Sequence, residues 1–273
     1  METLTLIYKK NLTEDLAIFR FQPSDGSPID DFKPGQFVTL GQKVDNDKII
    51  YRPYSISSPP SEKNYYEFYI KWKEHPTFGK FTTYLFNMNI GDCVFWRKPA
   101  GMFSIEEFFP NGISDTRQMI LVATGTGLAP FMSYILHLKD TGTKKRITLL
   151  HGVKYETELG YRDTLENLAS ESNESWNFNY FPTISRPNDP QNKNWKGFTG
   201  RVQKLIKCIK DHQSELEKLL NEKITPENSM FYLCGYKAMI DDVLSILKSA
   251  GFVTNRNRRD DDSFDVEYEL YGV

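Results

Sequence analysis

The segment YRPYSISSPP, residues 51–60, brings a cation, an aromatic ring and a hydroxyl close together as Arg52, Tyr54 and Ser55. On a β-strand, Arg52 and Tyr54 project to the same side, because side chains alternate with a period of two. An arginine can bind a phosphate, a tyrosine ring can stack on a flat heterocycle, and a serine can hydrogen-bond its edge. These residue types indicate a site for a planar, phosphate-bearing ligand. The alternative is an exposed strand face with a cation beside a tyrosine.

A glycine-rich turn, ATGTGLAPF at residues 123–131, follows an apolar strand and opens a predicted helix. Gly125, Thr126 and Gly127 would let backbone amides approach a ligand, and a helix N-terminus favours an anion such as a pyrophosphate. The spacing differs from the dinucleotide-binding fingerprint, because Pro130 takes the place of the third small residue. A tight turn without a ligand would also require glycine.

Basic residues follow a later strand of the same half of the chain. Ser185 and Arg186 end one strand, and Arg201 is predicted to begin a helix after GFTG. We expect these three side chains to converge at the carboxyl edge of a parallel sheet, where open α/β folds bind ligands. A 2′-phosphate, which NADP carries and NAD lacks, would suit these side chains. Charge-assisted hydrogen bonds contribute roughly 1.5 to 3 kcal/mol each, so two arginines could favour NADP over NAD by on the order of 100-fold. Each arginine taken singly is also compatible with an ordinary surface position.

The segment LCGYKAM, residues 233–239, ends a further apolar strand. Cys234 and Gly235 could let a flat ring come close to the sheet edge, or form only a small buried turn. Cys234 is not predicted to be a nucleophile, because no histidine or aspartate is placed in the sequence to activate it.

The two halves of the chain differ in hydrophobic period. Before residue 103, six short strand patterns are separated by Gly, Pro, Asn and Asp clusters, which indicates an antiparallel barrel or sandwich. The six patterns are TLTLIYK, LAIFRF, GQFVTLG, YRPYSIS, YEFYIKW and DCVFWRK, with one helical piece, KFTTYLFNM, before the last.

After residue 117, fully apolar strands alternate with helical segments, which is typical of a parallel sheet covered on both faces. The pairs are QMILVAT with PFMSYILHLK, RITLLHGV with YRDTLENLAS, NFNYFPTIS with RVQKLIKCIK, and MFYLCG with KAMIDDVLSILKSAG. The segment RPNDPQNKNWKG, residues 186–197, is predicted to be a solvated polar loop. We therefore expect two domains, over residues 1–105 and 116–273.

Composition narrows the functional classes. A net charge of −2 gives no electrostatic reason to expect nucleic acid or an anionic membrane as a partner. No signal peptide is recognisable, and no apolar run approaches the roughly 20 residues of a spanning helix, so a cytoplasmic protein is expected. The three cysteines and four histidines lack zinc or iron–sulfur spacing, so no metal site is expected.

Taken together, the motifs RPYS, FYIKW, GKFT, ATGTGLAP, ISR, TGR, LCG and the terminal YELY resemble the ferredoxin/flavodoxin–NADP reductase family in its bacterial form. They occur in the family's order and span nearly the whole chain. The resemblance implies an N-terminal antiparallel Greek-key β-barrel that binds FAD and a C-terminal parallel-sheet α/β domain that binds NADP(H). The segment CGYKAM departs from the family, because it lacks the Asn/Asp-Pro that often follows Cys-Gly.

The resemblance also assigns roles to single residues. Arg52 would hold the flavin phosphates, Tyr54 would stack on the isoalloxazine and Ser55 would bond its reactive edge. Further implied FAD contacts are Tyr69, Lys80, Phe81, Thr82 and Thr124. Implied NADP contacts are Gly125, Thr126, Gly127, Val153, Lys154, Ser185, Arg186, Arg201, Gly235, Tyr236, Lys237 and Asp242.

Four residues are implied at the reaction centre: Ser55, Cys234, Glu269 and Tyr271. Cys234 would lie near the nicotinamide. Aligning YELY with the family's V-E-x-Y ending makes Tyr271 the terminal aromatic residue that covers the flavin and Glu269 the acid beside it. An alternative register through VEY would select Glu267 and Tyr268.

The implied function is FAD-mediated exchange between the hydride of NADP(H) and single electrons of an external ferredoxin or flavodoxin, in a monomeric enzyme. Arg256, Arg258 and Arg259 could receive an acidic carrier, although three aspartates follow them. One alternative is an NAD(P)H-dependent reductase of free flavin, ferric iron or an oxygenase component. Another is a flavin-binding redox sensor without turnover.

Overall fold

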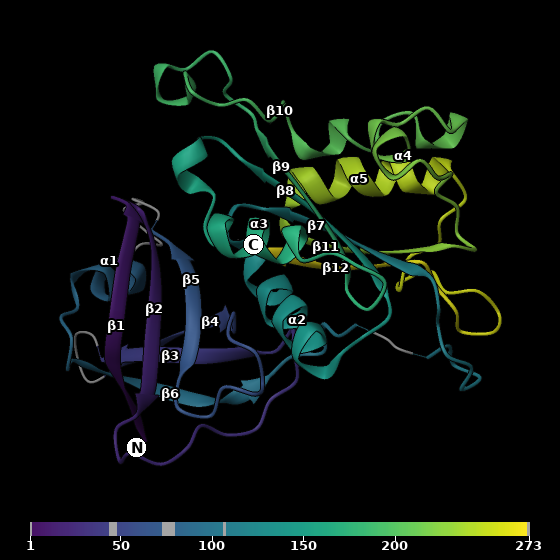
Figure 1. Cartoon of the computed structure of the whole chain (residues 1–273). Coiled ribbons are helices and arrows are strands. Elements are labelled where there is room, and N and C mark those ends of the chain that lie inside the picture. The colour runs from purple at the N-terminus through teal and green to yellow at the C-terminus, as the bar shows by residue number, and fades with distance from the viewer. Residues whose placement is uncertain (1, 44–47, 73–79, 106–107, 272–273) are drawn as a thin grey trace. The chain divides into compact units, whose positions relative to one another are not determined.

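The computed structural model describes residues 2–43, 48–72, 80–105 and 108–271, except for the side chain of Lys80 (Figure 1). The chain divides into two compact units. The first comprises Met1–Ser104 and Ala129–Thr141, and the second comprises Ile105–Leu128 and Gly142–Val273. The domain limits 1–105 and 116–273 stay a prediction.

The first unit contains a six-stranded antiparallel sheet in the order β4-β3-β6-β1-β2-β5. Its strands are β1 (Thr3–Thr13), β2 (Leu16–Pro23), β3 (Phe37–Lys43), β4 (Ile49–Ser55), β5 (Tyr66–Lys71) and β6 (Cys93–Ala100). A bridge between Ile56 and Phe68, next to the bond from the Ser57 amide to the Glu67 carbonyl (2.8 Å), joins the two outer strands. The sheet therefore closes into the predicted antiparallel barrel.

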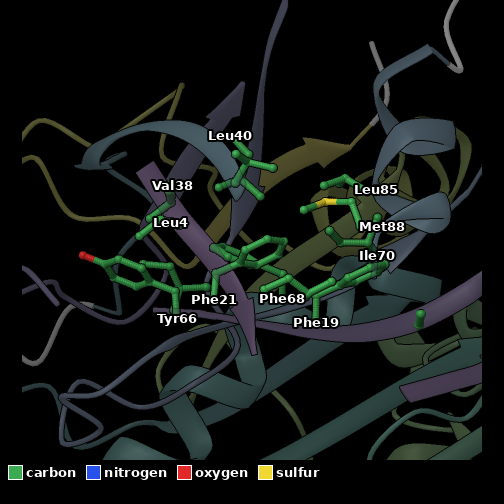
Figure 2. Close-up of a cluster of buried hydrophobic side chains, with 14 of the residues drawn as sticks. Leu4, Phe19, Phe21, Val38, Leu40, Tyr66, Phe68, Ile70, Leu85 and Met88 are labelled. Carbon is green, nitrogen blue, oxygen red and sulfur yellow. The ribbon is translucent and has the colours of Figure 1, made fainter. Parts of the chain in front are cut away.

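The barrel core follows directly from strand alternation. Phe19 and Phe21 on β2 face Phe68 and Ile70 on β5, and all four are nearly or fully buried (Figure 2). Leu85, from helix α1 (Lys80–Asn87), packs against the same cluster. Burial of each such side chain stabilises the fold by about 1.5–3 kcal/mol. The alternation of apolar and polar residues along each strand thus determines which side chains face outward.

The second unit contains a parallel sheet, as predicted, and its six strands lie in the order β10-β9-β8-β7-β11-β12. Its strands are β7 (Gln118–Thr124), β8 (Arg146–Val153), β9 (Asn177–Ile184), β10 (Phe198–Thr199), β11 (Ser229–Tyr236) and β12 (Val266–Tyr271). The chain builds outward from β7 through β8 to β10, and then returns to the other side of β7 with β11 and β12. The strand order therefore reverses between β7 and β11.

Helices and short turns connect these strands. The helices are α2 (Leu128–Thr141), α3 (Arg162–Ser170), α4 (Glu215–Leu220) and α5 (Lys237–Ser249). The 3-10 turns are η2 (Gly125–Gly127), η3 (Glu156–Glu158), η4 (Pro190–Asn192), η5 (Val202–Lys204) and η6 (Ile209–Asp211). Gly251 caps the C-terminus of α5, as predicted: it follows the last turn with a φ of +89°, and the Phe252 amide donates to the Leu247 carbonyl at 3.1 Å.

The predicted helix over RVQKLIKCIK is wrong. The segment forms η5 and η6, and Cys208 between them has a left-handed φ of 65°. Leu205, Ile206 and Ile209 are buried in one cluster beside α5, so packing rather than helix propensity decides the local conformation.

Helix α4 was not predicted, although its start carries a recognisable signal. Ser214 accepts a bond from the Glu217 amide (3.2 Å), and the Glu217 carboxylate accepts one from the Ser214 amide (3.0 Å). This is a capping box of the S-x-x-E type.

A buried ionic cluster ties the beginnings of β7 and β12 together. Arg117 donates to Asp115 Oδ2 and to Asp265 Oδ1, each at 2.7 Å, and Arg259 donates a further bond to Asp265. Asp265 also accepts the Val253 amide at 2.8 Å. Every charge in this cluster has a partner of opposite sign, as a buried charge requires.

Replacement of Asp265 by alanine should lower the free energy of unfolding by about 3–5 kcal/mol, because the variant leaves the buried Arg117 guanidinium without one of its two carboxylates. Urea denaturation followed by circular dichroism measures this loss. The exposed Asp260→Ala is the matched control and should change stability by less than about 0.5 kcal/mol. Equal effects of the two variants would contradict the assigned role of the cluster.

Candidate functional site

Two of the residues predicted for the flavin, Tyr54 and Phe81, lie close together in the barrel. Tyr54 on β4 lies with its ring 6.0 Å from that of Phe81 on α1 and 6.4 Å from that of Phe68 on β5. Burial raises the pKa of the Tyr54 phenol, so this side chain is neutral. Arg52 is exposed two residues earlier on the same strand, and its Nη1 donates to the Tyr51 carbonyl at 2.8 Å.

The other flavin candidates of this unit are placed less uniformly. Ser55 is buried at the end of β4, and Thr82 lies in the first turn of α1. Tyr69 is buried on β5 but points away from the core that Phe68 enters. Lys80 opens α1, and its side chain lies outside the described part of the structure.

This set of groups fits FAD by its chemistry. An exposed guanidinium and the first amides of α1 suit a diphosphate, while an aromatic ring and a hydroxyl suit the flavin ring system. The assignments of single residues to parts of the cofactor stay predictions.

In the second unit, the glycine turn lies where the strand order reverses. A Cβ at Gly127 would lie 2.2 Å from the Cys234 carbonyl oxygen, and a Cβ at Gly235 would lie 2.1 Å from Thr124 Oγ1. The Tyr236 amide donates to that same oxygen at 3.2 Å. Glycine is thus required at both positions for the ends of β7 and β11 to touch. This reversal point is where open α/β sheets bind ligands.

His151 supports the same turn, although the sequence pattern assigned it no role. It is fully buried at the end of β8, and its Nε2 lies 3.2 Å from the Gly125 carbonyl oxygen. Burial lowers its pKa to about 4, so the ring is neutral near pH 7. Because a carbonyl only accepts, Nε2 carries the hydrogen and donates. The signal in the sequence is a histidine at the end of an apolar strand.

Cys234 and Glu269 face each other across neighbouring strands. They are register partners in β11 and β12, and Cys234 Sγ lies 3.9 Å from Glu269 Oε2. Burial raises the pKa of the Glu269 carboxyl from 4.5 to about 7, against the opposing effect of the Cys234 hydrogen bond. Burial, and then the charge of Glu269, raise the pKa of the Cys234 thiol well above its usual value. Cys234 is therefore a neutral thiol at pH 7 and not an activated nucleophile.

Strand alternation separates the two candidate terminal tyrosines. Tyr268 packs against the core cluster beside α5, with the Arg256 guanidinium 4.6 Å above its ring. Tyr271 has the same parity on β12 as Glu269 and shares its face of the sheet. The geometry thus favours Tyr271 over Tyr268 as the companion of Glu269 and Cys234. A contact of Tyr271 with the flavin stays a prediction.

The predicted phosphate-binding residues lie along the carboxyl ends of β8, β9 and β10. Ser185 donates its amide to the Val153 carbonyl at 2.9 Å, and Gly200 donates to the Ile184 carbonyl at 2.7 Å. This register puts Arg186 and Arg201 on adjacent chain segments. Both side chains are exposed, and neither makes an ion pair within the described residues.

Lys204 adds a third cation that the sequence pattern did not single out. A Cβ at Gly200 would lie 2.5 Å from Lys204 Cδ and 2.8 Å from its Nζ, so the lysine side chain lies over this glycine. Gly200 has a φ of +105°, which a residue with a side chain rarely adopts. The edge therefore presents three cations, a composition that suits a phosphate.

Several predicted residues bond elsewhere. Asp242 accepts a bond from Gln203 Nε2 at 2.7 Å, and Lys237 pairs with Asp241 one turn along α5. Of the three arginines proposed to receive a carrier, Arg259 is bound to Asp265, which compensates its charge. Arg258 stacks on Phe264 at 4.8 Å.

Two other kinds of feature are absent from the part of the chain that the structure describes. No cluster of three or more His, Cys, Asp or Glu side chains there could hold a metal ion. None of the helices in the described ranges has the length and apolar character needed to cross a membrane.

The chain matches two family models of known type. Residues 3–105 match the oxidoreductase FAD-binding domain, and residues 121–245 match the oxidoreductase NAD-binding domain. Together with the barrel and the parallel sheet, these matches define a two-domain flavin-dependent oxidoreductase.

Curated relatives narrow this class. A flavodoxin/ferredoxin–NADP reductase of Buchnera aphidicola subsp. Baizongia pistaciae is 32% identical over 234 residues, which cover 85% of this chain and 84% of that protein. A ferredoxin–NADP reductase of Pseudomonas aeruginosa is 28% identical, with coverages of 81% and 80%. The chain belongs to the ferredoxin/flavodoxin–NADP reductase family, as its motifs predicted, and is an FAD-dependent oxidoreductase of NADP(H).

Other similarities show how widely this architecture is used. The crystal structure of a ferredoxin–NADP reductase from Neisseria gonorrhoeae with bound FAD and NADP has a TM-score of 0.76 at 23% identity, covering 98% of this chain and 97% of that one. A flavohemoprotein of Oceanobacillus iheyensis is 23% identical over 98% of this chain, but the match covers only 58% of that protein. For one component of the Na(+)-translocating NADH-quinone reductase of Idiomarina loihiensis the identity is 27%, over 79% of this chain and 49% of that protein.

The raised pKa of Glu269 predicts a pH-dependent stability. Between pH 4.5 and about 7 the folded protein binds more protons than the unfolded chain, so this residue lowers stability as the pH rises through that window. Glu269→Gln cannot ionise and should gain stability relative to the unmodified protein from pH 5 to pH 8. Melting temperatures across this range measure the difference, with the exposed Glu174→Gln as control. A difference that does not change with pH would contradict the assignment.

Proposed function

We propose that this protein exchanges a hydride with NADP(H) and passes single electrons to or from an external ferredoxin or flavodoxin. The observation that carries the proposal most directly is the group of exposed cations at the β8–β10 edge, Arg186, Arg201 and Lys204. Within the described residues none of them has a carboxylate partner, so they suit the additional phosphate that distinguishes NADP from NAD.

The proposed roles of the chain follow from where its polar groups lie. FAD, when bound, supplies the conversion between two-electron and one-electron transfer. Arg52 would bind its phosphates, and the neutral ring of Tyr54 would pack against its aromatic part. Glu269, with a pKa near 7, can hold or release a proton at its carboxyl during turnover. The neutral thiol of Cys234 would contact the nicotinamide without forming a covalent bond to it.

An external carrier is proposed on two grounds. The three cysteines, at positions 93, 208 and 234, are too widely spaced in sequence for an iron–sulfur motif of the chain's own. Two relatives that the match covers over 84% and 80% of their length are named for ferredoxin or flavodoxin. In the predicted carrier patch, Arg256 and Arg258 are exposed and form no ion pair with a carboxylate of the described residues. These two arginines are therefore the ones proposed to receive an acidic carrier. The expected monomeric state and cytoplasmic location belong to this proposal.

A second candidate function is supported by the flavohemoprotein and quinone-reductase relatives, of which this chain matches about half the length. The matched stretch is one part of each of those longer chains. On that alternative, this protein would pass electrons to a component of another kind, or to free flavin.

Turnover with different acceptors separates these functions. The holoprotein should reduce purified ferredoxin or flavodoxin with NADPH at least about tenfold faster than it reduces free FMN at equal concentration, because a docked carrier is oriented and a free flavin is not. Absorbance changes of each acceptor measure the rates, and a reaction without NADPH is the control. Faster reduction of free FMN would reject the proposal in favour of a flavin reductase. Absence of turnover with every acceptor would favour a sensor.

A further inference from the structure

The polar loop of residues 186–197 contains one side chain that is almost fully buried. The loop was predicted to be solvated surface, and most of it is exposed. Asn192, at the end of η4, retains only 3% of its accessible surface. A buried amide must satisfy its donors and its acceptor within the protein, so its partners show what the loop is attached to.

The Asn192 side chain makes three hydrogen bonds to backbone groups. Its Nδ2 donates to the Arg186 carbonyl at 2.8 Å and to the Lys154 carbonyl at 3.1 Å, and its Oδ1 accepts the Glu156 amide at 2.8 Å. Both amide hydrogens and the amide oxygen are thereby used. One side chain thus connects the segment after β9 to the segment after β8.

Both connected segments carry predicted nucleotide contacts. Lys154 follows the last residue of β8, and its amide is held by Glu158 Oε2 at 2.9 Å, while Asn192 binds its carbonyl. Arg186 is the second residue after β9. Val153 and Ile184 are register partners in the parallel sheet, so the two segments begin side by side.

Only backbone contacts position Arg186, because its side chain makes no ion pair within the described residues. The guanidinium is exposed and makes no ion pair there. Pro187 restricts Arg186 to extended conformations, and the Asp189 amide donates to the Arg186 carbonyl at 3.1 Å. Together with the Asn192 bond, these contacts fix the direction in which the side chain leaves the chain.

We propose that Asn192 is a positioning residue for the 2′-phosphate of NADP(H), acting by holding the backbone of Arg186 against the end of β8. This inference rests on the proposed nucleotide role of Arg186. Asn192 carries no charge and is buried, so it would influence the choice between NADP and NAD only through the position of Arg186.

Isothermal titration of the FAD-loaded protein with adenosine 2′,5′-bisphosphate and with 5′-ADP tests the inference without turnover. Asn192→Ala should weaken binding of the 2′-phosphorylated ligand by on the order of tenfold. The reason is that a displaced Arg186 would lose one well-oriented, charged hydrogen bond to the 2′-phosphate. Binding of 5′-ADP should change by less than about twofold, because that ligand lacks the 2′-phosphate that Arg186 is proposed to bind. Asn192→Asp should act in the same direction, since both donors are replaced by an acceptor oxygen facing two carbonyls.

Two reference variants make the test specific. Asn194→Ala changes an exposed asparagine of the same loop and should leave both affinities unchanged. Arg186→Ala removes the charge itself and sets the largest loss expected from mispositioning it. In turnover, Asn192→Ala should raise the KM for NADPH and leave kcat with NADH unchanged.

The outcomes separate this inference from the proposed function. If Arg186→Ala loses the 2′-phosphate preference and Asn192→Ala keeps it, Asn192 has no positioning role and the proposed function stands. Equal weakening of both ligands in Asn192→Ala would show a general structural role and overturn the inference. If the unmodified protein does not prefer the 2′-phosphorylated ligand, the proposed role of Arg186 fails and the inference fails with it.

Discussion

The second unit depends on one geometric constraint, the close approach of the ends of β7 and β11 where the strand order reverses. Two glycines permit it, because any side chain at Gly127 or Gly235 would overlap the opposing strand end. The Thr124 hydroxyl then bonds the Tyr236 amide across the junction. Cys234, whose carbonyl lies at this junction, is also the register partner of Glu269 on β12. The candidate reaction centre therefore lies on the strand that the junction positions.

The treatment of charge differs between the two ends of this sheet. At the amino ends of β7 and β12, Arg117, Asp115 and Asp265 are buried with their charges paired, which is the pattern of a structural cluster. At the carboxyl ends, Glu269 is largely buried and makes no ion pair within the described residues, and the exposed cations Arg186 and Arg201 also lack carboxylate partners there. Groups left uncompensated in this way are characteristic of sites that complete their electrostatics with a ligand.

The sequence predicted the parts of this fold that depend on local pattern. The six barrel strands and the apolar strands of the parallel sheet follow from alternation and from continuous hydrophobic runs, which burial enforces residue by residue. The segment RVQKLIKCIK was misread because its apolar spacing suits a helix, whereas its packing beside α5 favours two separate turns. Helix α4 was missed in spite of its capping box, whose residues Ser214 and Glu217 are visible in the sequence.

The remaining site residues could not be predicted because their roles arise from contacts distant in sequence. Asn192 is one of several asparagines in a polar loop, and only its burial against Lys154 and Glu156 distinguishes it. His151 is similarly identified by a bond to Gly125, 26 residues away. By contrast, Cys234 and Glu269 were expected from family resemblance, and the strand register brings them together, while their catalytic roles stay predictions.

The fold and the family together imply that FAD bound to this chain accepts a hydride from NADPH. Anaerobic titration of the purified holoprotein, with the flavin absorbance recorded after each addition, tests it most directly. One equivalent of NADPH should bleach the flavin rapidly, and NADH should do so on the order of 100-fold more slowly if two arginines select the 2′-phosphate. A flavin that stays oxidised with NADPH would contradict hydride transfer to FAD, and equally fast bleaching by both nucleotides would contradict selection through the 2′-phosphate.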